Sequence, residues 1–307
     1  MRYTYKKLAI IPLLLFATIA VGILVTIHAQ SVTPGLQVHP SNFAITLQPG
    51  QPTTETVYLD NRTNQEVPIN VELRNFTANG EEGAVNLTTD DTTYALAKWI
   101  TVSPSTASIP PHMSQKFTFT ITPPANAEPG GHYGSVVFAT TPTKNLNGTG
   151  AALSEEVASL ILATVPGNTT ENASILSFNT DKNFYDFGPV TFNMRVQNSG
   201  QIHIQPMGQV LIKGTFGDQY IANLQPYNVL PGAIRQIPIV LTHKLLIGKY
   251  TASVVAAYGS TNKQLVASTE FYAFPVQYGL IVLIILIILF LMRKRFGKAL
   301  KALMTGK

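Results

Sequence analysis

The sequence predicts an all-β chain in which two tandem β-sandwich domains lie between two apolar terminal segments. Three observations lead to this prediction: apolar and polar residues alternate through the middle of the chain, turn signals separate the alternating runs, and no convincing helical pattern occurs between Ser31 and Ala273. A period of two places one face of a strand in a core and the other face in water. Many short strands of this kind are typical of a sandwich.

The alternation is clearest in residues 68–76, 116–122 and 190–197. In the last of these, Val190, Phe192 and Met194 alternate with Thr191 and Asn193. Pairs or triplets rich in Gly, Pro and Asn punctuate the chain and are typical of turns between strands. These turn signals lie at residues 49–50, 79–80, 130–131, 198–200 and 231–232.

An internal duplication supports two copies of one immunoglobulin-like sandwich. Each copy has a strand that ends in Asn, then a Pro-containing turn into a strand, then Gly-x-Tyr at the start of a strand. The first copy covers residues 56–61, 109–121 and 131–139, and the second covers 192–198, 230–241 and 248–257. We therefore predict a first immunoglobulin-like domain over residues 30–165, a linker over 166–172 and a second immunoglobulin-like domain over 173–273.

The N-terminal segment is typical of an export signal. Arg2, Lys6 and Lys7 precede an apolar stretch over residues 8–27, and Ile27-His28-Ala29 resembles a cleavage site. We predict a signal peptide over residues 1–29, with Gln30 as the first residue of the mature chain. The alternative is an uncleaved signal anchor, because about twenty apolar residues suffice to cross a bilayer.

The C-terminal segment predicts a transmembrane helix. Residues 279–292 form an unbroken apolar run, and the aromatic residues Phe274 and Tyr278 extend it. Arg293-Lys294-Arg295 follows directly, as in a stop-transfer signal on the cytoplasmic side. We therefore predict a transmembrane helix over residues 274–292 and a basic cytoplasmic tail over 293–307. The resulting localisation is a single-pass type I protein of the cell membrane, with its sandwiches outside the cell and facing the wall.

Composition and charge exclude several classes of protein. The chain of 307 residues has no Cys, which excludes disulfides, thiolate zinc sites, iron–sulfur clusters and a cysteine nucleophile. Its net charge of +5 comes from the ends, because residues 30–274 hold 12 basic and 16 acidic residues, a net charge of −4. Nucleic acid binding needs a basic patch on the folded part. We therefore predict no nucleic acid partner.

The sequence predicts no enzyme, and thus no catalytic, cofactor-binding or metal-binding residues. The six histidines are all more than four residues apart, and no nucleophile elbow or Gly-rich phosphate loop occurs. The candidate binding residues lie in the polar, acidic stretch 79–91, for which the alternative is a solvated loop. They are Asn79, Glu81, Glu82, Asp90 and Asp91. Six Asn-x-Ser/Thr triplets are candidate glycosylation sites, at Asn61, Asn75, Asn86, Asn147, Asn168 and Asn172.

Several motifs resemble the WxL-interacting protein (WxLIP) family of bacterial cell-surface proteins. They are Ser41-Asn-Phe with Leu47-Gln-Pro-Gly50, Tyr58-Leu-Asp-Asn-Arg-Thr63, Ile109-Pro-Pro, and above all the run from Pro123 to Phe138. The resemblance covers about residues 41–165 well and the second domain in outline. It implies a signal peptide, two immunoglobulin-like domains, a transmembrane helix and a basic tail. It further implies that the first domain binds peptidoglycan and the second a partner protein with Trp-x-Leu motifs, and it transfers no individual binding residue.

The predicted function is therefore that of a non-enzymatic, membrane-anchored adhesion protein of the bacterial cell surface. Its two domains are expected to bind cell-wall peptidoglycan, a WxL-type partner surface protein, or both. No cofactor is expected. The alternative is a chaperone-like assembly factor for surface structures, which would act by lending a strand to its partner.

The two-domain prediction has a direct test in two inward-facing phenylalanines. Phe119→Ala should lower the free energy of unfolding of the first domain, and Phe192→Ala that of the second. Each loss should be roughly 3–5 kcal/mol, because each change removes a large core side chain. Urea unfolding of residues 30–165 and 171–273, with and without the change, measures both losses. If neither fragment unfolds cooperatively on its own, the two domains share one core.

Overall fold

The computed structural model describes residues 35–141 and 155–305, with only the backbone described for 293–305. The predicted signal peptide over residues 1–29 and the candidate glycosylation site Asn147 lie outside the described residues, as do the side chains of the predicted tail. The strands and the C-terminal helix belong to one compact unit, Leu36–Lys307.

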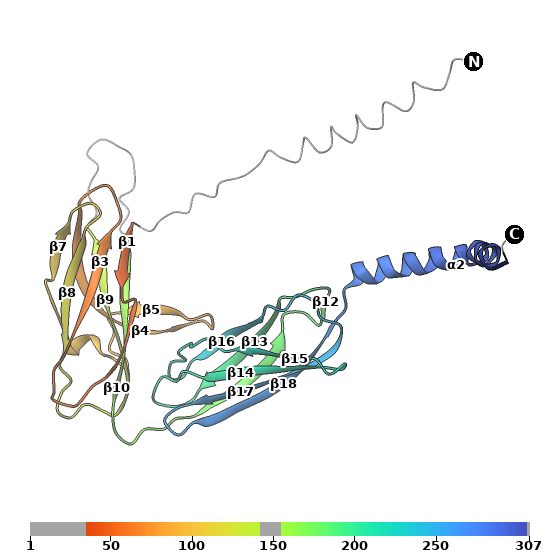
Figure 1. Ribbon diagram of the computed structural model, residues 1–307. Helices are drawn as coiled ribbons and strands as arrows, with labels where there is room; N and C mark the ends of the chain where they lie inside the picture. Colours follow the sequence, from red (N-terminus) through yellow and green to blue (C-terminus); the bar gives the residue numbers. More distant parts are fainter. Residues whose placement is uncertain (1–34, 142–154, 306–307) are drawn as a thin grey trace, which may run out of the picture. The chain divides into compact units, whose positions relative to one another are not determined.

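The first sandwich packs a four-stranded sheet, in the order β1-β3-β8-β6, against a second sheet in the order β2-β10-β9-β4-β5, in which β7 also pairs with β4 (Figure 1). Its strands are β1 (Leu36–His39), β2 (Asn42–Thr46), β3 (Thr53–Asn61), β4 (Val67–Asn79), β5 (Ala84–Thr88), β6 (Ile100–Ser103), β7 (Thr106–Ile109), β8 (Ser114–Ile121), β9 (Gly130–Thr140) and β10 (Glu156–Val165), with a 3₁₀ helix η2 (Ala97–Trp99). Strand β1 pairs with β3 in one sheet, and β2 pairs with β10 in the other. The chain therefore changes sheet between these two short strands.

The second sandwich packs a sheet in the order β11-β13-β16 against a sheet in the order β12-β18-β17-β14-β15 (Figure 1). Its strands are β11 (Ala173–Thr180), β12 (Phe184–Tyr185), β13 (Val190–Asn198), β14 (Met207–Gly214), β15 (Gln219–Asn223), β16 (Ile234–Leu241), β17 (Gly248–Tyr258) and β18 (Lys263–Ala273). The prediction of a largely β chain with two β-sandwiches is confirmed.

The predicted alternation places the large side chains in the cores. Phe117 and Phe119 of β8 are fully buried between the sheets of the first sandwich, and the Phe117 ring centre lies 4.8 Å from that of Phe138 in β9. In the second sandwich, Phe192 of β13 is fully buried and lies 5.8 Å from the ring of Phe271 in β18. Phe119 and Phe192 belong to separate hydrophobic clusters.

Strand β9 is buried on both faces, and its glycines allow this. The side chain of Tyr133 folds back over the strand, so that a Cβ on Gly131 would lie 2.1 Å from the Tyr133 hydroxyl oxygen. A Cβ on Gly134 would lie 3.0 Å from the Cβ of Leu96. Larger residues at either position would displace these neighbours. This packing gives a physical reason for the Gly-Gly-His-Tyr-Gly run in the motif that resembles the WxL-interacting family.

Asn61 ends strand β3 and ties together two distant parts of the first sandwich. Its buried amide nitrogen donates hydrogen bonds to the carbonyl oxygens of Gln65 at 2.7 Å and Ile109 at 2.8 Å. Its side-chain oxygen accepts a hydrogen bond from the backbone N–H of Thr63 at 2.9 Å. The side chain thus satisfies backbone groups that the strands leave unpaired.

Asn198 repeats this arrangement at the end of β13 in the second sandwich. Its amide nitrogen donates to the carbonyl oxygens of Ile202 and Val229, both at 2.8 Å, and its oxygen accepts from the N–H of Gly200 at 2.9 Å. The "strand that ends in Asn" of the sequence duplication is therefore a buried hydrogen-bonded brace in each sandwich.

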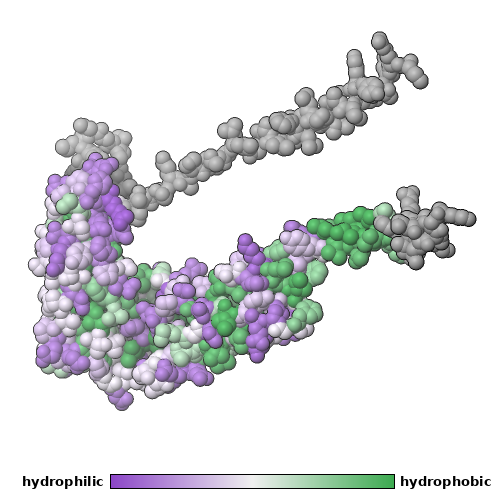
Figure 2. All heavy atoms as spheres, in the orientation of Figure 1, coloured by the Kyte–Doolittle hydropathy of each residue, from purple (hydrophilic) through white to green (hydrophobic). Residues whose placement is uncertain are grey.

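The C-terminal segment forms one helix, α2 (Val276–Thr305), whose described side chains are mostly apolar and exposed (Figure 2). Within the described part of the chain, no helix combines the length and the apolar character needed to cross a membrane. This finding corrects the prediction of a transmembrane helix over residues 274–292. The helix begins at Val276, two residues later than the predicted span, and continues to Thr305. The single-pass type I topology was predicted from that segment, so the same finding removes its basis.

The two asparagine braces predict matched losses of stability. Asn61→Ala or Asn198→Ala leaves buried backbone groups without a hydrogen-bond partner, which should lower the free energy of unfolding by about 2–3 kcal/mol. Urea unfolding of the protein measures the loss, and Asn86→Ala, at an exposed position of β5, is the control. Losses no larger than that of the control would contradict a bracing role.

Candidate functional site

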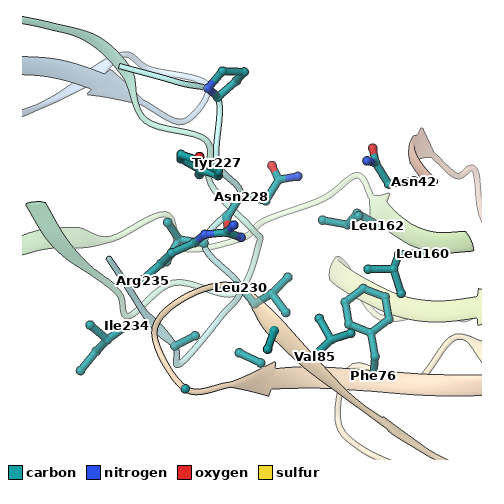
Figure 3. A pocket seen from close by; sticks show the side chains of 17 residues that line it. Asn42, Phe76, Val85, Leu160, Leu162, Tyr227, Asn228, Leu230, Ile234 and Arg235 are labelled. Atoms are coloured by element: carbon teal, nitrogen blue, oxygen red, sulfur yellow. The ribbon is translucent and has the colours of Figure 1, made fainter. Parts of the chain in front are cut away.

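The candidate site is a cleft of about 270 Å³ that both sandwiches line (Figure 3). The first sandwich contributes residues of β4, β5 and their connecting turn, together with residues of β10 and Asn42 at the start of β2. The second contributes residues 226–230 and the start of β16. This volume is close to the lower end of the ~300–1,000 Å³ range of ligand pockets. It suits one or two side chains of a larger partner.

The floor of the cleft is apolar and lies on the outer face of the sheet that contains β9. Phe76, Tyr133 and Leu162 form a small buried cluster there, separate from the main core. Leu160 and Leu230 pack against this cluster, and Leu230 comes from the second sandwich. Figure 3 shows Phe76, Leu160 and Leu162 side by side along one wall. This sheet is therefore apolar on both faces, whereas a sheet of simply alternating strands has one apolar and one polar face.

Hydrogen bonds join the two sandwiches beside this floor. The Tyr133 hydroxyl accepts a hydrogen bond from the backbone N–H of His203 at 2.9 Å, and its oxygen lies 3.3 Å from His203 Nδ1. The backbone N–H of Gly131 donates to the carbonyl oxygen of Gln201 at 2.9 Å. Burial raises the pKa of the Tyr133 hydroxyl and lowers the pKa of the His203 imidazole. Both groups are therefore neutral at pH 7.

Glu81, one of the predicted binding residues, makes an internal ion pair. Its carboxylate accepts hydrogen bonds from Arg195 Nε at 2.6 Å and Arg195 Nη2 at 2.5 Å. These hydrogen bonds lower the pKa of Glu81 and raise that of Arg195. Its carbonyl oxygen also accepts a hydrogen bond from the backbone N–H of Gln236 in β16 at 2.7 Å. The turn between β4 and β5 is thus attached to the second sandwich.

The structure does not gather the other predicted binding residues around Glu81. Asn79 is the last residue of β4, and Glu82 lies in the turn that follows; both are exposed. Asp90 and Asp91 lie beyond the far end of β5, where the Asp91 carboxylate pairs with Lys98. The acidic stretch is thus divided between the two ends of a hairpin.

Arg235, which the sequence did not single out, is a charged group in the wall of the cleft. Its Nη1 donates a hydrogen bond to the carbonyl oxygen of Asn228 at 2.8 Å, and its guanidinium lies 4.8 Å from the centre of the Tyr227 ring. A Cβ on Gly83 would lie 2.2 Å from Arg235 Nη2, and Gly83 has a φ of +85°. The positive φ favours glycine here, and a side chain at this position would also have to push the end of the Arg235 side chain aside.

The guanidinium of Arg235 has unused hydrogen-bonding capacity. Its Nε is buried and has no hydrogen-bond partner among the described residues. Burial lowers the pKa of Arg235, although an arginine remains a cation in a protein. From sequence, this residue is one polar position near the start of an alternating strand. The burial and the lack of a partner arise only from the fold.

Two of the candidate glycosylation sites are buried in the described structure. Asn61 and Asn75 are 1% and 2% exposed. The Asn75 amide nitrogen donates to the carbonyl oxygen of Asp90 at 2.9 Å, so a glycan on that nitrogen would break a structural hydrogen bond. The other described candidates, Asn86, Asn168 and Asn172, are exposed.

In residues 35–141 and 155–292, no group of three or more His, Asp or Glu side chains could hold a metal ion.

No protein-family model matches the chain, and no curated protein matches it. The resemblance to the WxL-interacting family therefore stays a prediction.

Solved structures with similar folds include several chaperones of fimbriae and pili. The Escherichia coli chaperone DraB is 14% identical, with a TM-score of 0.37, over 76% of this chain and 95% of that chain. A chain of the Salmonella enterica SafA pilin–SafB chaperone complex is 12% identical, with a TM-score of 0.37, over 76% of this chain and 96% of that chain. A chain of a chaperone–tip adhesin complex of CFA/I fimbriae is 10% identical, with a TM-score of 0.39, over 77% of this chain and 98% of that chain. Likeness at this level transfers no function to this chain.

Proposed function

We propose that the chain is a non-enzymatic binding protein that holds a segment of a partner protein in the cleft at the junction of its two sandwiches. The observation that carries this proposal is an open cleft with an apolar floor and a polar rim. The floor is provided by Phe76, Leu160 and Leu162, and the rim by Asn42 and Arg235. Apolar lining with a few polar groups is the usual composition of a binding site.

The chemistry of the cleft favours a peptide over a wall polymer. Its floor is mainly aliphatic, and the Tyr227 ring at its edge is occupied by the guanidinium of Arg235. An apolar side chain fits such a floor better than a sugar does, because a sugar carries hydroxyl groups that need hydrogen-bond partners. Peptidoglycan binding by the first domain rests on the sequence resemblance and stays a separate prediction.

The strand edges bear on the alternative function of an assembly factor that lends a strand. Strand β16 is the terminal strand of its sheet, but its Gln236 N–H donates to Glu81, and Pro238 two residues further has no N–H. Proline at such a position prevents pairing with another strand. Strand β5 is also terminal, and its first residues, Ala84 and Val85, line the cleft. A partner segment in the cleft could therefore pair with β5, which keeps this alternative within the same site.

The test is to select peptides on the protein and then alter the floor of the cleft. A random 12-residue peptide library displayed on phage is panned on the immobilised protein, and the dissociation constants of the selected peptides are measured. Leu160→Glu places a charge on the floor and should weaken their binding at least tenfold. The control is Leu176→Glu, at an exposed position of β11 that does not line the cleft.

Two outcomes would contradict the proposal. Selected peptides that bind the Leu160→Glu protein as tightly as the unaltered protein would place the site elsewhere. Purified peptidoglycan is the second probe. If the protein co-sediments with it and Leu160→Glu abolishes this binding, the occupant of the cleft is the wall polymer and not a protein.

A further inference from the structure

The charge balance of the cleft is unusual. Of the described residues that line it, Arg235 is the one that carries a full charge. The nearby carboxylate of Glu81 does not offset this charge, because Arg195 holds both of its oxygens. A bound group therefore meets an apolar surface with a single positive charge at one side.

The guanidinium of Arg235 is held in place without an acidic partner. It lies against the Tyr227 ring on one side and the backbone of Gly83 on another, and Asn228 accepts its one described hydrogen bond. Placing a cation in a partly buried site without a carboxylate is unfavourable, and most buried arginines are paired. Its position is nevertheless fixed, which lowers the entropy lost when a ligand binds.

These observations point to one ligand chemistry. A carboxylate is the group that matches a guanidinium best, because it can accept two parallel N–H···O hydrogen bonds. It would also neutralise the charge that the cleft leaves uncompensated. The apolar floor lies next to this position, so the rest of the ligand should be apolar.

We propose that the cleft recognises a carboxylate that lies beside an apolar side chain in the partner protein, and that Arg235 is the residue that binds it. This inference rests on the proposed function, since it names the chemistry of the segment that the cleft holds. The carboxylate can belong to an Asp or Glu side chain or to the C-terminus of the partner. Both sources present the same group to the guanidinium.

The experiment compares peptides that differ only in this charge. The probes are acetyl-Ala-Leu-Leu with a free C-terminus and its C-terminal amide, and acetyl-Leu-Asp-Leu-amide with its Asn counterpart. Titration calorimetry of the whole protein measures each dissociation constant at pH 7. At least one of the two acids should bind about tenfold or more tightly than its neutral counterpart. The pair that shows this difference identifies the source of the carboxylate.

Variants of Arg235 assign the difference to this residue. Arg235→Met should remove the preference for the acid, and Arg235→Lys should keep part of it, because lysine retains the charge but not the two-pronged geometry. Arg62→Met, at an exposed position of the first sandwich, is the control and should change nothing. Thermal unfolding checks that each variant is folded. If Arg235→Met is not folded, the partial loss in Arg235→Lys carries the test.

The outcomes separate the two proposals. If acids and neutral peptides bind equally well to the unaltered protein, the carboxylate inference is wrong and the proposed function stands. If Arg235→Met and Arg235→Lys keep the full preference, Arg235 is not the recognising residue and the inference also fails. If no probe binds, and the peptides selected from the library bind independently of Leu160, the proposed function itself is wrong.

Discussion

The structure depends on one constraint, which is that strand β9 has to be covered on both of its faces. One face lies in the main core of the first sandwich, where Phe138 packs against Phe117. The other face carries Tyr133, which would expose a large ring to water if nothing covered it. Its burial is completed by Phe76 and by contacts with His203 of the second sandwich. Burial of apolar surface is the main favourable contribution to folding, so this second face favours contact between the two sandwiches.

The hydrogen bonds at the junction follow from the same constraint. Once Tyr133 is buried, its hydroxyl needs a partner, and the backbone N–H of His203 provides one. The turn between β4 and β5 adds the Glu81–Arg195 ion pair and the hydrogen bond to Gln236. The hydrogen bond from Gln236 to Glu81 occupies part of the edge of β16. Contacts that join the sandwiches therefore also protect a strand edge that could otherwise pair with another chain.

The cleft is a consequence of how this junction is built. Its apolar floor is the part of the second face of the sheet that the other sandwich does not fully cover. Arg235 lies at its side because Gly83 has no Cβ and Tyr227 provides a ring to stack on. Binding of a partner segment here would complete the burial that the two sandwiches begin. The proposed site therefore lies at the junction, where Gly80, Gly83, Ala84 and Val85 of the predicted stretch 79–91 contribute to the lining and its acidic residues do not.

The sequence by itself determined the strands, the two sandwiches and the duplication, because period-two alternation and turn residues are local properties that the chain carries along its length. It indicated that Asn61 and Asn198 were equivalent, but not that they are buried braces. The position of Arg235 in a cleft, the pairing of Glu81 and the burial of Asn75 were decided only by the tertiary structure. These features depend on residues far apart in the chain, such as Glu81 and Arg195, whose proximity no local pattern records.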